Sequence, residues 1–473
     1  MTIILSIIFA FSTLAAFQVF AIGTYGVAPV IIALAFFYFY FLKRVIWNGD
    51  KLQFQPNASL TLLAIVISIA LISGINPLIS ANKYEITQFL KTSIHFLFLT
   101  AFTLICCFYK IENFSWKTVL KVFLILSIFI NVFGIYQVTA RAFDLPLAWL
   151  ELSNESLTAR GTASGFDPYQ QLALQFENFF RATSIFSEPS IYASYNIIVL
   201  IFLVIPLLKT KRGIIKSNLV KGIVLILAVA GLFLTFSLTG LLSFAAIAFA
   251  VFLFERSKRL KYFVYFLVGT IFVIAITDTL VENVTEISVA KLFSNRLEKI
   301  YKSKRIGAES IEGESVSTRY DYQKRAVEIW AQHPFLGCGI GLVGYNKKVD
   351  LKFADTGLTQ VIAETGAIGT LFYLAFFGSL FIALLKLNRE VTKNEELSDI
   401  DKSLASCSFY LLIHIVIINF ITANNFITPI SWLYLGFIFS VMNNLFGKLG
   451  YRLKVIEFSP KSAKTKLIAG TSK

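Results

Sequence analysis

Runs of about 20 apolar residues recur along nearly the whole chain, and they constrain its fold more than any other feature. A helix needs about that length to cross the hydrocarbon core of a bilayer, which is roughly 30 Å thick. Hydrophobic residues make up 56% of the 473 residues and charged residues only 15%, which excludes a set of soluble domains. The sequence therefore predicts an all-α, polytopic integral membrane protein.

Twelve runs are long enough to predict membrane-spanning helices. They lie near residues 3–22, 26–42, 58–75, 89–109, 118–139, 191–208, 222–236, 239–254, 262–277, 357–385, 403–421 and 431–446. The predicted units are helices 1–5 in 1–139, a long loop in 140–190, helices 6–9 in 191–277, a second long loop in 278–355, helices 10–12 in 356–446 and a basic tail in 447–473. The first run has no charged flank and no small-residue cleavage site, so it predicts a spanning helix rather than a removed signal peptide.

Basic residues of the connections gather on one side of the predicted helices. The segments 43–53, 110–117, 209–221, 255–261, 386–402 and 447–473 hold 25 basic and 9 acidic residues, a net of +16, whereas the whole chain has +15. The short connections on the opposite side carry one basic residue, Lys83. Connections rich in Lys and Arg stay in the cytoplasm, so both termini are predicted to be cytoplasmic. The positive surplus is explained by topology and requires no nucleic acid partner.

The two long connections, 140–190 and 278–355, both fall on the external side. The second holds an amphipathic stretch at 287–305 that predicts a helix lying on the lipid headgroups. Its apolar residues at helical spacing are Phe293, Leu297, Ile300 and Tyr301, with Arg296, Lys299, Lys302 and Lys304 elsewhere around the helix. A second helix is predicted at 318–332, followed by a flexible glycine-rich bend at 337–341.

The four cysteines and three histidines form no spaced cluster. Cys106 and Cys107 are adjacent inside an apolar run, and the other cysteines and all three histidines are far apart in the sequence. A disulfide framework and a zinc site are therefore not expected. We predict no metal and no cofactor.

Arginines in the external loops are candidate anchors for a lipid pyrophosphate, because a guanidinium is always charged and binds phosphate through two N–H groups. Arg181 stands shortly before a predicted helix start at Ser187–Ser190, which contains Glu188. The alternative is structural: Glu188 complements the helix dipole and Arg181 pairs with it.

A second candidate, Arg319, lies in the predicted helix at 318–332. Helical spacing puts Arg319, Gln323 and Ala326 on one stripe, with Tyr322 nearby. Arg325 lies on a different stripe, where a solvated surface charge is the plainer interpretation. Tyr320 and Tyr322 can stack on sugar rings, although packing is the more common role of such residues.

The third candidate site is the start of the tenth predicted helix. Glu364 stands in an apolar run, where an ionisable group is costly and suggests a function. The alternative is a structural acid that hydrogen-bonds a neighbouring loop beside Gly366 and Gly369. Asp355, at the membrane edge, is either a base or an N-cap.

Four segments resemble, in their order, the signatures of the O-antigen polymerase and ligase superfamily. They are Arg181 with Phe186–Ser190, the turn Ser237–Leu242, Arg319–Trp330 with His333–Gly341, and Gln360–Gly369. The resemblance implies a bacterial inner-membrane glycosyltransferase with a C-type-like helical bundle and an active site facing the periplasm. It implies transfer of a glycan from undecaprenyl pyrophosphate without a metal ion. The implied partners are lipid-linked oligosaccharide, membrane lipids, and a chain-length regulator and flippase of the same pathway.

Two departures from the family pattern favour a polymerase over a ligase. Family ligases carry a His near the start of the helix matched by 357–385, where this chain has Asp355 and Thr356. Leu238 stands where many ligases have Arg. The resemblance assigns Arg181 and Arg319 to the departing pyrophosphate and makes Glu188 and Asp355 candidate bases, with Glu364 a structural support.

Two other functions are kept as alternatives. A ligase would transfer finished polymer to the lipid A core. A flippase or transporter would move a polar or lipid-linked substrate across the bilayer, although we find no internal repeat of the kind that many transporters show.

Overall fold

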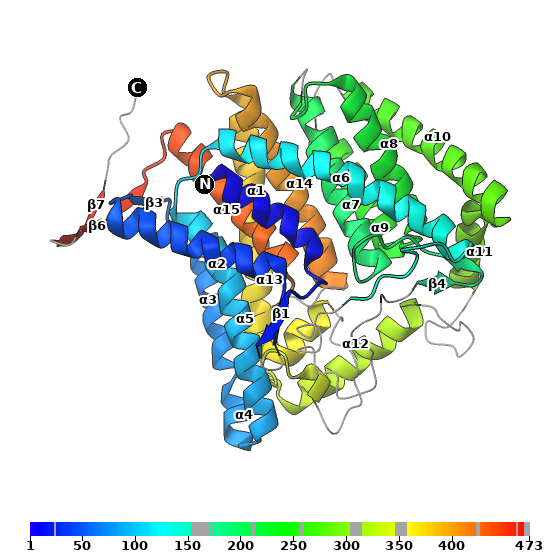
Figure 1. Cartoon of the computed structure of the whole chain (residues 1–473). Coiled ribbons are helices and arrows are strands. Elements are labelled where there is room, and N and C mark those ends of the chain that lie inside the picture. The colour runs from blue at the N-terminus through cyan, green and yellow to red at the C-terminus, as the bar shows by residue number, and fades with distance from the viewer. Residues whose placement is uncertain are drawn as a thin grey trace.

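The structure is a computed structural model that describes residues 1–22, 25–152, 171, 174–210, 213–255, 260–302, 315–345, 357–421, 426–459 and 462–467. Within these ranges the chain is mainly helical (Figure 1). The α-helices are α1 (Thr2–Phe11), α2 (Pro29–Leu42), α3 (Ala58–Ile72), α4 (Ile75–Ser80), α5 (Lys83–Phe108), α6 (Asn113–Ala142), α7 (Pro189–Lys209), α8 (Asn218–Leu234), α9 (Leu238–Phe254), α10 (Leu260–Thr285), α11 (Val289–Lys302), α12 (Ser315–Gln332), α13 (Leu358–Lys393), α14 (Asp399–Ile421) and α15 (Pro429–Lys448).

The described part of the chain has nine helical segments that are long and apolar enough to cross a membrane. Three shorter apolar helices, Thr2–Leu14, Asn218–Leu234 and Leu238–Phe254, accompany them. Each predicted run contains one of these helices, so the protein is a multi-pass membrane protein. The count of twelve crossings stays a prediction, because the three shorter helices fall below the length of a full crossing.

The first predicted run, residues 3–22, is not one helix. α1 ends at Phe11 and a 3-10 turn follows at Ser12–Leu14. The hydroxyls of Ser12 and Thr13 donate to the carbonyls of Phe9 and Ala10, each at 2.7 Å. Such bonds from a hydroxyl to its own helix slightly destabilise and bend the helix.

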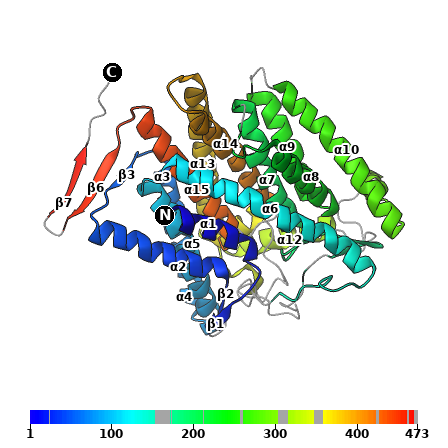
Figure 2. The same ribbon diagram turned by 45° about the horizontal axis from the view of Figure 1, so that its top comes forward.

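Short strands also qualify the all-α prediction, although none of those described lies inside the helical bundle. β1 (Phe20–Ile22) pairs with β2 (Tyr25–Val27), and β4 (Gln175–Phe176) pairs with β5 (Phe179–Phe180), both antiparallel. A third sheet has the order β3-β6-β7, from β3 (Leu52–Phe54), β6 (Lys454–Ser459) and β7 (Ser462–Leu467). Figure 2 shows this sheet projecting from the side of the bundle next to the C-terminus.

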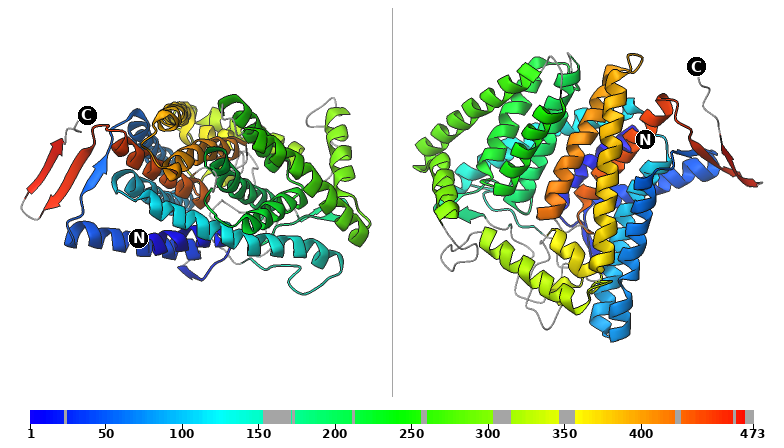
Figure 3. Two further views of the ribbon diagram at one scale, coloured as in Figure 1. Left: turned by 90° about the horizontal axis from the view of Figure 1, so that it is seen from above. Right: turned by 180° about the vertical axis from the view of Figure 1, so that it is seen from behind.

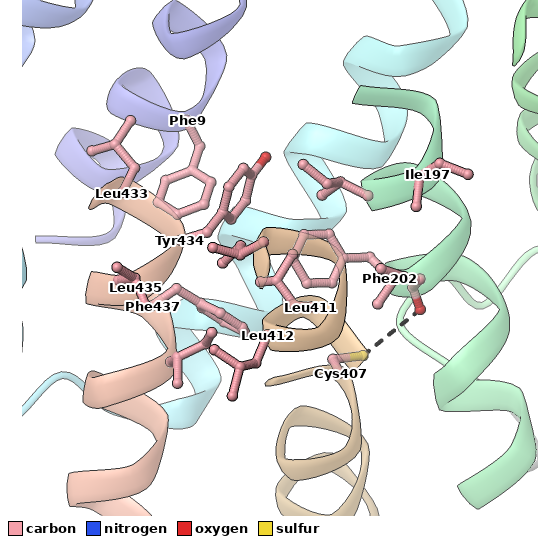
Figure 4. Close-up of a cluster of buried hydrophobic side chains, with 14 of the residues drawn as sticks. Phe9, Ile197, Phe202, Cys407, Leu411, Leu412, Leu433, Tyr434, Leu435 and Phe437 are labelled. Carbon is pink, nitrogen blue, oxygen red and sulfur yellow. Dashed lines mark hydrogen bonds between the residues drawn. The ribbon is translucent and has the colours of Figure 1, made fainter. Parts of the chain in front are cut away.

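The centre of the bundle is formed by α7, α14 and α15, whose side chains are largely buried. Phe202 of α7 packs between two aromatic rings of α15, with centroid distances of 6.1 Å to Tyr434 and 5.6 Å to Phe437. Figure 4 shows this cluster and the thiol of Cys407, which lies 3.9 Å from the carbonyl of Ile201. Aromatic packing therefore joins α7 and α15 at the centre.

The bundle has two ends of different character. α7 and α14 run antiparallel, because Ser194 contacts His414 while Ile201 contacts Cys407. The end of α7 and the start of α14 therefore lie together, and we call this the ion-pair end. It carries Lys209–Glu255 and Lys448–Asp401, each at 2.8 Å.

The opposite end holds the start of α7, the end of α14 and the start of α13. Figures 1 and 3 show α12 lying across this end, outside the bundle. α11 and α12 confirm the two helices predicted at 287–305 and 318–332. We call this the broken-helix end, after the interruption of α13 described below.

Candidate functional site

α13 is interrupted at Gly366, inside a helix that runs from Leu358 to Lys393. Gly366 has φ 69° and ψ −171°, far from helical values. The break leaves main-chain groups without helical partners, and a neighbouring loop supplies them. The amide of Ala367 donates to the carbonyl of Pro334 at 2.8 Å, and the amide of Ile368 donates to that of Phe335 at 3.3 Å.

The same loop also donates hydrogen bonds to the helical turn before the break. The amide of Cys338 donates to the carbonyl of Ala363 at 2.9 Å, and the amide of Gly339 donates to that of Glu364 at 3.0 Å. Irregular backbone at a helix break is tolerated inside a membrane protein when other protein groups satisfy it. The loop at 333–341 therefore forms one structural unit with the start of α13.

Two glycines let this loop lie against the helix. Gly337 has φ 71°, and a Cβ there would overlap the main chain of Glu364. Gly341 has φ 78°, and a Cβ there would overlap the side chain of Thr92 on α5. The bend predicted at 337–341 is present, and its glycines are required by the close approach of backbone to α13 and α5.

Glu364 is fully buried and acts within this unit. Its carboxylate accepts a hydrogen bond from the amide of Gly341 at 3.0 Å and another from Nε2 of Gln360 at 3.0 Å. One oxygen thus holds the loop and the other holds the preceding turn of its own helix. This geometry corresponds to the structural interpretation of Glu364 rather than to a base open to substrate.

α12 packs on this unit through small and aliphatic side chains. Ala326 and Ile329 are fully buried and cluster with Val343 and Ala363, with Tyr322 and Cys338 packed against them. Arg325 is half-buried. The backbone of Arg319 and Tyr320 lies in the first turns of α12, but their side chains and Asp355 lie outside the described parts of the structure. The predicted inward direction of Arg319 stays a prediction.

Arg181 is half-buried against the turn between α8 and α9. Its Nε donates to the carbonyl of Thr235 at 2.9 Å, and its Nη2 donates to that of Phe236 at 3.3 Å. Phe236 has φ 51°, a left-handed conformation that is unusual for an aromatic residue. Arg181 therefore stabilises a strained turn as well as carrying charge to this end of the bundle.

A second arginine, Arg296 of α11, reaches the same turn. Its Nη1 donates to the carbonyl of Phe236 at 3.2 Å, and its guanidinium lies 4.8 Å and 5.2 Å from the ring centroids of Phe176 and Phe236. Only 3% of Arg296 is exposed. It lies on the buried side of α11 with Phe293, three residues away, and not on a solvated face. One side of α11 is thus docked on the protein, and the contact of this helix with lipid headgroups stays a prediction.

A third arginine, Arg141 at the end of α6, organises the segment that carries Arg181. Its guanidinium donates to the carbonyls of Ala148 and Arg181 and to the side chains of Gln171 and Thr183. The two side-chain contacts are both 2.7 Å. Arg141 is 3% exposed, and the described acceptors are all neutral. Sequence reasoning missed Arg141 and Arg296 because their burial depends on contacts between distant segments.

Glu188 is the N-cap residue of α7, which begins with Pro189. Its carboxylate accepts a hydrogen bond from Oγ of Ser190 at 3.0 Å and makes no side-chain cap to the helix amides. The side chain is half-buried. It lies seven residues after Arg181 in the chain, at the same end of the bundle as the break in α13.

An apolar groove of about 400 Å³ lies between α8, α9, α10 and α11, next to the α8–α9 turn that Arg181 and Arg296 contact. Phe233, Leu241, Phe244, Ile274 and Phe293 line it, with the hydroxyls of Ser237 and Ser294 at its polar edge. Ser237 caps α9 by accepting from the amide of Gly240 at 3.3 Å. The positive end of the α9 dipole therefore adjoins an apolar surface, and both arginines contact the turn that precedes it.

The described residues include no group of three or more His, Cys, Asp or Glu side chains placed to hold a metal ion. Residues 223–374 match the family model described as O-Antigen ligase. The matched region covers the α8–α9 turn, α11, α12, the loop at 333–341 and the break in α13. The chain matches no curated protein.

Proposed function

Because residues 223–374 place the chain in the O-antigen polymerase and ligase superfamily, we propose that it polymerises lipid-linked oligosaccharide repeat units. It would transfer a glycan from undecaprenyl pyrophosphate to the non-reducing end of another lipid-linked unit. The observation that carries the proposal is an apolar groove at the α9 N-terminus, next to the turn that Arg181 and Arg296 contact. A pyrophosphate on an isoprenoid chain requires this combination of cationic donors and apolar surface.

The chemistry assigned to Arg181 and Arg319 follows from the charge that the reaction develops. When the bond between the sugar and the pyrophosphate breaks, negative charge grows on the leaving pyrophosphate. Guanidinium groups already held in place stabilise that charge without having to reorganise. Arg181 is held in this way by the carbonyls of Thr235 and Phe236.

A base must take the proton of the attacking sugar hydroxyl. We expect Glu188 or Asp355 to do so, because a carboxylate within hydrogen-bond reach of the hydroxyl suffices. The side chain of Glu188 suits this role because the structure describes a single hydrogen bond to its carboxylate, from the hydroxyl of Ser190. Glu364 is a poorer candidate because its oxygens are bound to Gly341 and Gln360.

Because the matched family is described as O-antigen ligase, one other function is also favoured, that of a ligase which transfers polymer to the lipid A core. Two sequence features weigh against it. The positions just before α13, where ligases carry a His, hold Asp355 and Thr356 in this chain. Leu238, at the start of α9, stands where many ligases have an Arg.

A deletion strain separates the two functions. Loss of a polymerase leaves lipid A core capped with single repeat units. Loss of a ligase leaves long polymer that never reaches lipid A, and this outcome would refute the polymerase proposal. Complementation with the wild-type chain and with Arg181→Ala controls for effects on neighbouring genes.

A further inference from the structure

Arg141, one residue before the end of α6, holds the main chain of Arg181. Its Nη1 donates to the carbonyl of Arg181, and its Nη2 donates to Oγ1 of Thr183 at 2.7 Å. The guanidinium of Arg181 is held separately, by the carbonyls of Thr235 and Phe236. Arg181 is therefore fixed at two points, its main chain by α6 and its side chain by the α8–α9 turn.

Gln171 extends this bonding to the residues that follow. Its Oε1 accepts from Nη2 of Arg141 at 2.7 Å, and its Nε2 donates to the carbonyls of Ser184 and Phe186 at 2.9 Å and 2.8 Å. Ser184 has φ 51°, a left-handed conformation that a residue other than glycine keeps only when its surroundings enforce it. The hydroxyl of Ser184 donates to the carbonyl of Ile130 in α6 at 2.7 Å. This stretch of chain is therefore braced against α6 in one conformation.

The guanidinium of Arg141 is enclosed by protein. Only 3% of the residue is exposed, and the ring centroid of Trp149 lies 5.4 Å from the guanidinium carbon. A buried cation is costly unless hydrogen bonds offset the cost, and four bonds to uncharged acceptors do so here. A group enclosed in this way does not contact a substrate, so any effect on a reaction passes through the residues that it holds.

We propose that Arg141 is a positioning residue for glycan transfer, which acts by keeping Arg181 in place at the leaving pyrophosphate. The role rests on the proposed function, in which Arg181 stabilises the charge that develops on that group. An anchor already in place needs no reorganisation as the charge develops, and a misplacement of 1 Å can cost about 10²-fold in rate. Loss of Arg141 releases the main chain of Arg181, so we expect a slower chemical step rather than weaker substrate binding.

The first addition between radiolabelled lipid-linked repeat units, measured per folded molecule of purified full-length protein, tests this role. Arg141→Met should lower kcat at least tenfold and change KM less than twofold. Lys209→Met, which removes a buried cation at the ion-pair end, is the matched control and should keep the wild-type kcat. A wild-type kcat in folded Arg141→Met, or a loss that lies wholly in KM, would overturn the proposal.

A second variant covers the case in which Arg141→Met does not fold. Arg141→Lys keeps the buried charge, but a single ammonium lacks the planar fork that spans the four acceptors. It should fold and still lower kcat at least threefold. Full activity of Arg141→Lys would show that only the charge matters and would contradict the positioning role.

A double-variant cycle shows whether Arg141 acts through Arg181. The Arg181→Ala protein has no guanidinium left to position, so adding Arg141→Met should lower its residual kcat less than twofold further. Losses that come from a general disturbance of the fold would multiply instead. A second loss as large as the one in the wild-type background would therefore contradict the proposal.

Hydrogen exchange tests the bracing of Arg181 independently of glycan transfer. The amides of Arg181 and Ala182 donate to the carbonyls of Leu174 and Leu234, so their exchange reports whether this stretch stays in place. Arg141→Met should speed exchange of these two amides at least tenfold and leave α15 unchanged. Unchanged exchange at both amides refutes the bracing, whereas a folded wild-type protein that makes no addition refutes the proposed function.

Discussion

The two ends of the bundle use charged residues in different ways. At the ion-pair end, Lys209 and Lys448 contact the carboxylates of Glu255 and Asp401 at 2.8 Å. At the broken-helix end, Arg141, Arg181 and Arg296 donate to backbone carbonyls or neutral side chains. In the contacts that the structure describes, one end pairs its cations with acids, whereas the other holds its guanidiniums in place through neutral acceptors.

We therefore expect the cations of the ion-pair end to contribute to stability and those of the broken-helix end to contribute to function. A cation paired with a carboxylate has little remaining attraction for an incoming anion. A guanidinium bound to carbonyl oxygens keeps its full charge while its geometry is held, which is the condition for electrostatic catalysis on a developing anion. The comparison predicts that changes at the broken-helix end reduce glycan transfer and that changes at the ion-pair end reduce stability.

The largest effect is expected for Arg181→Ala. Loss of a preorganised donor to a developing charge costs about 10²–10³-fold in rate, so chain extension should disappear from a gel assay of glycan length. Arg325→Ala, a half-buried arginine of α12, is the matched control and should reduce extension less. Because Arg181 also holds the α8–α9 turn, the melting temperature of each purified variant is measured. A folded Arg181→Ala protein with wild-type extension contradicts its assignment as an anchor.

The next effect belongs to the ion-pair end. The side chains of Lys209 and Glu255 are 9% and 2% exposed, so Lys209→Met leaves a buried carboxylate without its cation. Removal of one partner of a buried pair costs about 3–5 kcal/mol. Thermal unfolding in detergent should show a clear loss, with glycan transfer per folded molecule unchanged. Recovery of stability in the double variant Lys209→Met with Glu255→Leu supports this reason, and lost activity at full stability argues against it.

Variants of Glu364 test whether a buried acid at the broken-helix end has a structural role or a chemical one. Glu364→Ala removes the acceptor of the Gly341 amide and should cost about 1–3 kcal/mol of stability. Glu364→Gln keeps an acceptor oxygen and should retain most of the stability and the glycan transfer. If Glu364→Gln abolishes transfer in a protein of normal melting temperature, Glu364 acts in the chemistry and its structural role is insufficient.

The smallest effect is expected for Arg44→Ala at the ion-pair end. Arg44 contacts Asp50 at 2.8 Å, but its side chain is 40% exposed. Exposed ion pairs contribute about 0–1 kcal/mol, so a shift in melting temperature close to the error of the measurement is expected. A large shift would show that the surface pairs at this end matter more than their exposure indicates.

Hydropathy predicted the helices well, because a bilayer requires long apolar runs and the chain supplies them. It could not show that α1 ends at Phe11 and continues as a 3-10 turn, since Ser12 and Thr13 interrupt the apolar run only briefly. It also could not show the break at Gly366. That break exists because a loop about thirty residues earlier in the chain supplies the missing hydrogen bonds.

The candidate site was predicted in part. Arg181, Glu188 and Glu364 stand out in the sequence as charges next to apolar runs, and the structure places all three at the broken-helix end. Arg141 and Arg296 were missed as contributors because an arginine in a polar loop or an amphipathic helix usually faces water. Their burial comes from contacts with Gln171, Thr183 and Phe236, which hydropathy does not reveal.

Incubation of the purified protein with undecaprenyl-pyrophosphate-linked repeat units tests the central proposal most directly. We predict a ladder of lipid-linked glycans of increasing length with the wild-type protein and none with Arg181→Ala. The contradicting result is the absence of any ladder from a folded wild-type protein that instead transfers preformed polymer to the lipid A core.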